Sequence, residues 1–429
     1  MQRIKVSDNR RHFVTPDGAP FFWLADTAWE LFHRLSWEEA RYYLHERTAH
    51  GFTVVQAVVL AELDGVDSPN ANGDKPLYDR DPERPNEAYF QHIDRILAEA
   101  ALQGLYIALL PAWGDKVSKR YDWAVGPEIF HAQNAFSYGR WLASRYRDAS
   151  NIVWILGGDR NPDEREVAIW SAMAKGIREA DPAAMMTFHP QPFDGNSSSA
   201  WFHDSDWLSF NMLQTGHNKY TAVAEMITVD YTRKPAKPVL NGEPTYEAHP
   251  LSFKPSEGYS SDADIRRDAW LSVFAGACGH TYGCHSVWQF YAAGREGVNH
   301  PILEWRKALA LAGASQMKHL RQLMMSHSPL KRIPGNDLLA GPDMGEIRDC
   351  IIATRADDGS YGYVYTATGK RVIVNAGVMA GDLLRAYWMS PRDGTTTLPL
   401  DLAKKTKMEF TPPNSGEGCD WVLVLEGVE

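Results

Sequence analysis

Cysteine is scarce in this sequence. Only four of its 429 residues are cysteine, and they stand far apart, at Cys278, Cys284, Cys350 and Cys419. Four scattered cysteines are too few for a disulfide framework of the kind that holds small secreted domains together. Their number fits a reducing compartment, or a secreted protein that does not need disulfide bridges.

Long apolar runs are missing as well. The N-terminal stretch MQRIKVSDNRRHFVT has no apolar core of the kind that a signal peptide needs. No run approaches the roughly 20 apolar residues that span a bilayer. We therefore expect no membrane partner. As written, the sequence predicts a cytoplasmic protein, or an exported one if a leader has been removed.

Positive charge is in deficit, because 44 lysines and arginines face 54 acidic residues, for a formal net charge of −10. Nucleic-acid binding needs clustered basic side chains, so we expect no nucleic-acid partner. The sequence also lacks a GxGxxG turn, a GxSxG elbow and a GxxxxGK[ST] loop. These absences argue against a dinucleotide enzyme, a serine hydrolase of that type and a P-loop NTPase. The oligomeric state cannot be read from the sequence.

Cysteines and histidines do crowd together in CGHTYGCH, at residues 278–285. Zinc sites favour paired ligands from separate segments, whereas these residues alternate along one predicted strand and face different ways. Metal-dependent hydrolase barrels open with an H-x-H motif on the first strand, and this chain has LADTAW there. We therefore expect neither a metal nor an organic cofactor, and keep a metal-dependent hydrolase as a further alternative.

Aromatic residues are abundant instead, with 15 tryptophans and 18 tyrosines. Indole and phenol rings line sugar-binding clefts, although large cores also use them. Eight apolar, strand-like runs alternate with helical segments, which is typical of a (β/α)8 (TIM) barrel of the α/β class. An open doubly wound sheet is the runner-up. The runs cover residues 21–29, 52–61, 105–113, 151–159, 185–190, 207–216, 237–243 and 280–288.

The pattern changes near residue 330. From there short segments alternate apolar and polar residues and are separated by turn signals such as Asp-Gly. This pattern predicts a small antiparallel β-sandwich. We expect a barrel domain at residues 1–330 and a sandwich domain at residues 331–429.

Two acids stand where predicted strands end. Asp159 follows the fourth run in NIVWILGGDRNPD, and Glu243 ends the seventh in KPVLNGE. Barrel enzymes carry their chemistry at the carboxyl ends of the strands, and cleavage of a glycosidic bond needs two carboxyl groups that flank it. The pair therefore predicts a glycosidase. Alternatively, Asp159 caps the following helix, and Glu243 is an ion-pair partner.

Other polar and aromatic residues near strand ends are candidates for sugar contacts, because amides and carboxylates bind hydroxyl groups and indoles stack on sugar rings. The alternatives for them are capping or packing. The candidates are Asp26, Trp29, Trp113, His189, Asn211, Gln214 and Trp288.

The segments PFFWLADTAWELFHRLSWEEARYYLHERTAHGFTVVQ, NIVWILGGDRNPD and PVLNGEPTYE resemble the apiosidase-like glycoside hydrolase family over residues 10–325. The tail resembles the small β-sandwich appended to these barrels and named for collagen binding. The resemblance implies a retaining hydrolase with Asp159 as acid/base and Glu243 as nucleophile. It also implies activity on pectic, apiose-containing side chains. One departure is Gly-Asp on the fourth strand, where the broader retaining clan has Asn-Glu. A non-catalytic carbohydrate-binding barrel is the alternative function.

Overall fold

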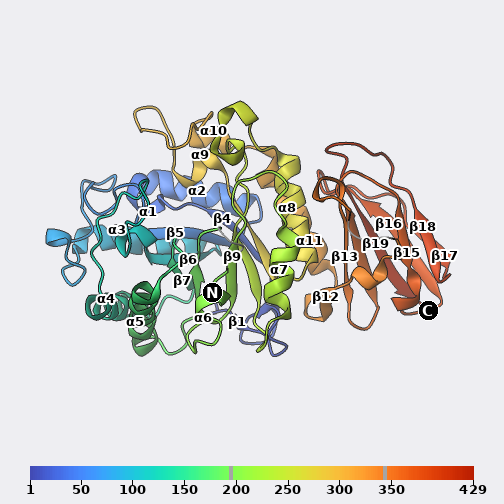
Figure 1. Ribbon diagram of the computed structural model, residues 1–429, viewed down its shortest axis with the longest axis horizontal. Coiled ribbons are helices and arrows are strands. Elements are labelled where there is room, and N and C mark those ends of the chain that lie inside the picture. Colours follow the sequence, from blue (N-terminus) through green and yellow to red (C-terminus); the bar gives the residue numbers. More distant parts are fainter. Residues whose placement is uncertain (193–196, 342–344) are drawn as a thin grey trace.

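The structure is a computed structural model that describes residues 1–192, 197–341 and 345–429. Within these ranges eight parallel strands form a barrel (Figure 1). Six of them make one sheet in the order β11-β4-β5-β6-β7-β8, and β10 pairs with β9. The strands are β4 (Trp23–Thr27), β5 (Val54–Leu60), β6 (Tyr106–Ala112), β7 (Ile152–Gly157), β8 (Met186–His189), β9 (Asn211–Gln214), β10 (Val239–Glu243) and β11 (Gly279–Tyr282).

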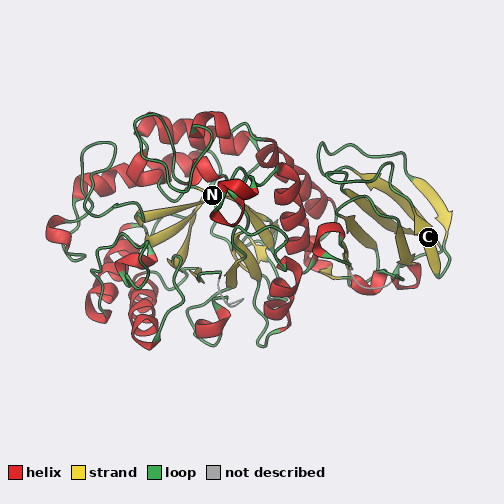
Figure 2. Ribbon diagram, turned by 45° about the horizontal axis from the view of Figure 1, so that its top comes forward, coloured by secondary structure: helices red, strands yellow, loops and turns green. Residues whose placement is uncertain are grey.

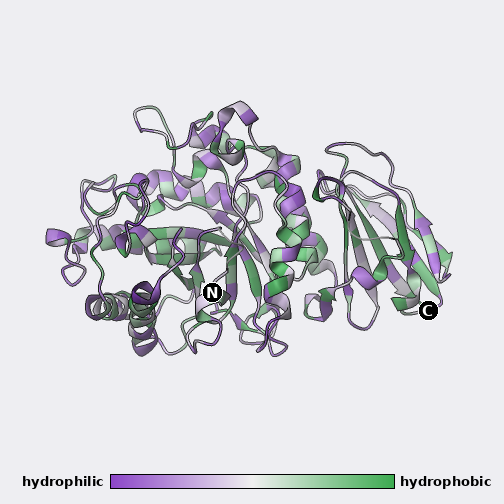
Figure 3. Cartoon of the chain, viewed as in Figure 1, coloured by the Kyte–Doolittle hydropathy of each residue, from purple (hydrophilic) through white to green (hydrophobic). Residues whose placement is uncertain are grey.

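Backbone hydrogen bonds join the two sheets. Ser209 N donates to Met186 O at 2.8 Å, between the start of β9 and β8, and Cys278 N donates to Val239 O at 2.9 Å, between β11 and β10. The strands are apolar and almost wholly buried, as expected for a parallel sheet that is covered by helices. Figure 3 shows the strand ribbons mainly in the hydrophobic colour and the surrounding helices in mixed colours. The barrel prediction is confirmed.

Helices surround the barrel and follow its strands (Figure 2). Ser36 starts α2 with a capping box, in which its hydroxyl accepts from Glu39 N and the Glu39 carboxylate accepts from Ser36 N. Such a cap stabilises a helix by about 1 kcal/mol. The helices are α1 (Leu31–Arg34), α2 (Trp37–Ala49), α3 (Glu87–Leu102), α4 (Ala132–Arg145), α5 (Glu164–Ala180), α6 (Ser199–Phe202), α7 (Val223–Thr232), α8 (Asp262–Phe274), α9 (His285–Trp288), α10 (Trp305–Ala308) and α11 (Ala312–Ser326). No helix in the described part of the chain is long and apolar enough to cross a membrane.

Two details differ from the sequence pattern. The eighth run divides into β11 and the short helix α9, and the chain turns at Gly283, where a side chain would lie 2.0 Å from the Tyr246 ring. A three-stranded antiparallel sheet, which the pattern did not indicate, precedes the barrel: β1 (Lys5–Val6), β2 (Phe13–Val14) and β3 (Pro20–Phe21). Phe13 of this sheet packs against Phe210, with ring centroids 5.0 Å apart, so the small sheet closes the barrel at the amino ends of its strands.

The C-terminal domain is antiparallel, as predicted. Its larger sheet has the order β12-β13-β14-β19-β16-β17, and β15 pairs with β18. The strands are β12 (Arg332–Pro334), β13 (Ile351–Ala356), β14 (Tyr361–Thr366), β15 (Val372–Asn375), β16 (Leu383–Met389), β17 (Leu400–Ala403), β18 (Lys407–Phe410) and β19 (Trp421–Val428).

The C-terminal domain packs against α8 and α11 of the barrel (Figure 1). Arg266 of α8 forms a buried ion pair with Asp420, with Nε 2.9 Å from Oδ2. Trp270, one turn further along α8, stacks on Tyr365 with ring planes 6° apart. Arg332 reaches back and donates to the carbonyl oxygens of Val273 and Ala277. These contacts fix the second domain on the barrel.

Candidate active site

Asp159 is delivered by a tight turn at the end of β7. Gly157 and Gly158 have φ values of 88° and 123°, and Asp159 itself has a φ of 49° in the left-handed region. Glycine adopts the first two angles at little cost, and aspartate tolerates the left-handed region better than most other residues. At Gly158 a side chain would also lie 2.6 Å from the Trp113 ring. The GGD sequence therefore aims the Asp159 carboxylate while the backbone passes close to Trp113.

The helix-capping alternative for Asp159 is not what the structure shows. The N-cap of α5 is Asp163, whose carboxylate accepts from Glu166 N at 2.9 Å. Asp159 lies four residues earlier, and its Oδ1 accepts a hydrogen bond from Gln214 Nε2 at 2.9 Å. Gln214 is the last residue of β9, so two strand ends converge on this carboxylate.

Glu243, the last residue of β10, lies beside Asp159. A carboxylate oxygen of Asp159, one of Glu243 and a ring nitrogen of His189 all lie within 4.8 Å of one another. His189 Nε2 is 3.1 Å from Glu243 Oε2, and His217 Nε2 is 3.3 Å from Glu243 Oε1. Each oxygen of Glu243 therefore faces an imidazole, and the two acids share one small space.

The surroundings separate the pKa values of the two acids. Burial alone would raise the pKa of Glu243, but the hydrogen bonds and charges of His189 and His217 outweigh it and lower that pKa to about 2. Burial, and then the charge of Glu243, raises the pKa of Asp159 to about 6. One carboxyl group is thus held ionised while its neighbour keeps its proton in mildly acidic solution. This division suits a nucleophile and a proton donor.

Aromatic side chains form the walls of the site. Trp29 Nε1 donates to the Tyr246 hydroxyl at 3.1 Å, and burial, followed by the charge of Glu243, raises the pKa of that hydroxyl. The Trp29 ring lies 5.1 Å from Trp113 and 5.5 Å from His189. Trp288 belongs to the same apolar cluster and donates through Nε1 to His285 Nδ1. The structure therefore gathers Trp29, Trp113, His189 and Gln214 around the two acids, and Trp288 stays a predicted sugar contact.

Two predicted sugar-binding residues lie elsewhere. The Asp26 carboxylate is fully buried between β4 and α2, where it accepts from Arg47 Nε at 2.6 Å and from the Tyr43 hydroxyl. Asn211 is the first residue of β9, at the amino end of the strand, and its Oδ1 lies 3.2 Å from His203 Nδ1. Both side chains serve the packing of the barrel, and we correct their assignment as sugar contacts.

Sequence reasoning missed His217 and Tyr246, which both touch Glu243. His217 follows β9 in the segment LQTGH, and Tyr246 stands three residues after Glu243 in GEPTY. Polar residues in the same two strand-exit loops as the predicted catalytic groups were the available signal. It was not specific enough, because every such loop carries several polar residues.

Asp159, His189 and Glu243 also make up a set of groups that could hold a metal ion. Carboxylate oxygens and an imidazole are ligands that several divalent ions accept. A metal ion at this position would compete with His217 for the Glu243 carboxylate, because His217 Nε2 already lies 3.3 Å from Oε1.

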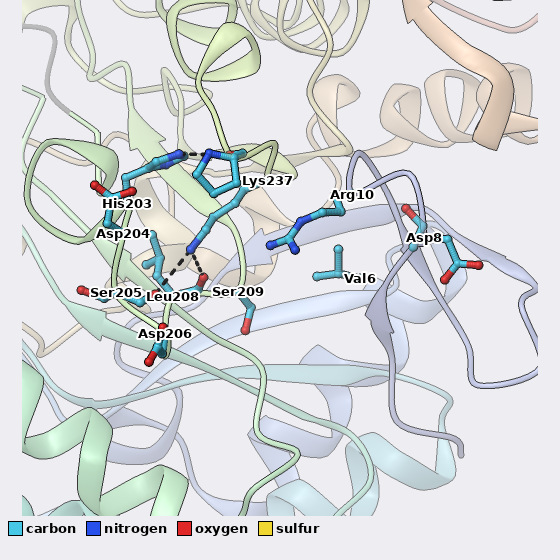
Figure 4. Close-up of a pocket in the computed structure, with 12 residues that line it drawn as sticks. Val6, Asp8, Arg10, His203, Asp204, Ser205, Asp206, Leu208, Ser209 and Lys237 are labelled. Atoms are coloured by element: carbon cyan, nitrogen blue, oxygen red, sulfur yellow. Dashed lines mark hydrogen bonds between the residues drawn. The ribbon is translucent and has the colours of Figure 1, made fainter.

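A separate cavity lies at the other end of the barrel. It has a volume of about 580 Å³ and is lined by residues that precede β9 and β10, among them His203, Leu208 and Lys237 (Figure 4). Lys237 Nζ points to the backbone oxygens of Ser205 and Leu208, and burial lowers its pKa to about 8. The acids stand at the carboxyl ends of the strands, so this cavity is separate from them.

Comparison with known proteins agrees with this arrangement. Residues 7–331 match the family model described as "Apiosidase-like, catalytic domain", and residues 333–426 match "Putative collagen-binding domain of a collagenase". No curated protein sequence matches the chain.

Solved structures resemble the whole chain. One described as a glycoside hydrolase is 32% identical, with a TM-score of 0.90, over 99% of this chain and 97% of that one. Another, a glycoside hydrolase family 5 structure from Bacteroides vulgatus, is 32% identical, with a TM-score of 0.91, over 99% and 94% of the two chains. The family match and these relatives show that the protein is a glycosidase. The chain belongs to the apiosidase-like family of glycoside hydrolases.

Proposed function

We propose that the protein is a retaining glycoside hydrolase of pectic oligosaccharides, including those that carry apiose. Glu243 is the nucleophile and Asp159 the acid/base. The observation that carries the mechanism is the spacing of the acids, whose facing oxygens lie within 4.8 Å. Retaining glycosidases hold their carboxyl groups about 5–5.5 Å apart, and inverting enzymes about 6.5–9.5 Å, which leaves room for a water molecule between acid and sugar.

The proposed reaction has two steps. Asp159 donates its proton to the leaving oxygen while the ionised Glu243 attacks the anomeric carbon and forms a covalent glycosyl-enzyme. Asp159, now ionised, then takes a proton from water, which attacks the same carbon and releases Glu243. His189 and His217 keep Glu243 charged before the attack. Gln214 holds Asp159 in place through both steps.

The pectic substrate class rests on family membership and on the indole-rich walls of the site, since apolar C–H faces of sugars pack on such rings. The test uses pectin-derived oligosaccharides that carry terminal apiose and the 4-nitrophenyl glycoside of the same sugar. Proton NMR during the first turnovers reports the anomer released. Net retention is expected, and inversion of the anomeric centre would overturn the proposed mechanism.

Variants of the two acids separate their roles. Glu243→Gln should abolish turnover and leave sugar binding intact, which also distinguishes an enzyme from a carbohydrate-binding protein. Asp159→Asn should lower turnover of oligosaccharides by about 10²–10⁴, the usual contribution of a general acid/base. With the nitrophenyl glycoside, added azide should rescue Asp159→Asn and yield a glycosyl azide of retained configuration. Full turnover by Glu243→Gln would contradict the assignment.

A further inference from the structure

One tryptophan in the structure is exposed, and it lies next to the catalytic acid. All fifteen tryptophans fall within the described residues, and fourteen of them are buried or half-buried. Trp123 is 48% exposed. An exposed indole is costly, because its apolar surface stays in water. Such a residue marks a contact site when the surrounding structure holds it in place.

Trp123 is held by two neighbours. Its ring stacks on that of Tyr121, with centroids 5.4 Å apart and planes 13° from parallel. The guanidinium carbon of Arg160 lies 4.4 Å from the Trp123 centroid and 5.3 Å from that of Tyr121. The 5.3 Å between the Arg160 guanidinium carbon and the Tyr121 centroid is too short for two groups that lie on opposite faces of the Trp123 indole. Tyr121 and Arg160 therefore lie toward one side of Trp123, and the other face is free of both.

Arg160 ties this aromatic pair to the acid. It is the residue after Asp159, it is 1% exposed, and its Nη1 donates to the Asp159 carbonyl oxygen at 2.6 Å. Its Nε donates to Ser118 O at 3.0 Å, in the segment that carries the two rings. The Arg160 side chain therefore connects the Trp123 and Tyr121 rings to the backbone of Asp159.

The segment that carries the rings is anchored at its base. Asp115 and Lys116 form an ion pair of 2.9 Å with no exposed side-chain surface. Asp115 Oδ2 accepts from Gly126 N at 2.7 Å, and Lys116 Nζ donates to Gly126 O at 2.8 Å. At Gly114 a side chain would lie 2.1 Å from the Gly158 carbonyl oxygen, so this segment and the Asp159 turn are in direct contact.

We propose that Trp123, backed by Tyr121 and Arg160, is a sugar-binding platform for the leaving-group side of an oligosaccharide. This inference rests on the proposed function, because the acid that protonates the leaving oxygen is Asp159, and the platform adjoins that acid rather than Glu243. The ligand is a pyranose or furanose unit beyond the bond that is cleaved. Its apolar C–H face packs on the free face of the indole, as cationic and aromatic groups do on the other side.

The test compares a long and a short substrate. Trp123→Ala should lower kcat/KM at least tenfold on pectin-derived oligosaccharides, chiefly through KM, and change it less than twofold on the 4-nitrophenyl glycoside, which has no sugar on that side. Trp123→Phe should restore most of the loss. Equal losses on both substrates would show that Trp123 only braces Arg160 and Asp159, and would overturn the proposal. Unchanged kinetics on both would overturn it as well.

Tyr42→Ala is the matched control. Tyr42 is an exposed ring on α2, also with a guanidinium over it, since Arg306 lies 5.1 Å from its centroid. It stands on the outer helix layer, away from the strand ends. Its replacement should leave both substrates unaffected.

Binding without turnover gives an independent reading. In the Glu243→Gln background, migration through native gels that contain soluble pectin should be retarded, and addition of Trp123→Ala should abolish the retardation. If the Glu243→Gln protein is not retarded in any of the gels, whether they contain pectin, arabinoxylan or galactomannan, the platform proposal is overturned. Failure of the proposed function has a different signature, namely full turnover by Glu243→Gln.

Discussion

At the scale of single residues, the site depends on an asymmetry between two similar groups. Glu243 has an imidazole nitrogen within 3.1 Å of one carboxylate oxygen and within 3.3 Å of the other, whereas Asp159 receives a hydrogen bond from a neutral amide and faces the charge of Glu243. The same small space thus lowers the pKa of one carboxyl group and raises that of the other. Because the two groups interact, their protonation steps belong to the pair.

The pH dependence of activity follows from these values. The proposed mechanism requires Glu243 to be ionised and Asp159 to be protonated, so kcat/KM should decrease as the pH drops below about 2 and as it rises above about 6. Above pH 6 the loss should approach tenfold per pH unit, as the acid form of Asp159 disappears. The measurement uses an oligosaccharide, because a nitrophenyl leaving group needs little protonation. A profile that stays flat from pH 6 to pH 9 would contradict the assigned proton donor.

At the scale of elements, the turn after β7 controls where the acid stands. Gly158→Ala should reduce kcat/KM by about 100-fold or more, because the new methyl group would lie 2.6 Å from Trp113 and 3.0 Å from Gly114 N at a φ of 123°. Steady-state kinetics and thermal unfolding of the variant check this. Unaltered activity would mean that the turn does not position Asp159.

Gly104→Ala is the control for backbone strain. Gly104 follows α3 with a φ of 78°, and a side chain there would meet no atom within 4 Å. Its replacement should cost about 1 kcal/mol of stability and leave kcat/KM unchanged. The contrast between the two variants separates strain from displacement of the acid.

The sequence was sufficient to predict most of the strands and their exits, and therefore the positions of Asp159 and Glu243 at strand ends. Apolar runs between helices reveal a buried parallel strand, and the residues at or just beyond its carboxyl end lie at the barrel mouth. The direction of side chains within a strand is a different matter. Asp26 lies in a strand with five buried residues, so no apolar–polar alternation shows that its carboxylate faces Arg47 on α2. Asn211 was misplaced because its strand begins four residues later than the apolar run.

At the scale of the whole molecule, the C-terminal domain shares a buried interface with the barrel. Arg266 is buried in the interface and donates three hydrogen bonds to the Asp420 carboxylate. Around this pair the Trp270 and Tyr365 rings stack. The domain boundary therefore runs through a packed core rather than along a flexible linker, although recognisable linkers are common between domains.

Removal of Asp420 tests this interface. Asp420→Ala leaves the buried Arg266 without its main counter-charge and should lower the free energy of unfolding by about 3 kcal/mol. Denaturant unfolding should show the loss in the barrel as well as in the sheet domain. The double variant Arg266→Met/Asp420→Leu should recover most of it, since paired apolar side chains of similar size replace such pairs well. A loss confined to the C-terminal domain would argue for two independent units.

The position of β19 has a consequence for biosynthesis. This strand lies between β14 and β16 in the middle of its sheet, yet every other strand of that sheet precedes it in the chain. A ribosome must therefore translate past Trp421 before the sheet can form around its centre, and Asp420 reaches Arg266 at the same late stage. Until then Arg266 of α8 lacks the Asp420 carboxylate. Premature termination a few codons upstream would remove the central strand and the counter-charge together, and quality-control proteases would meet a chain that still contains the whole barrel.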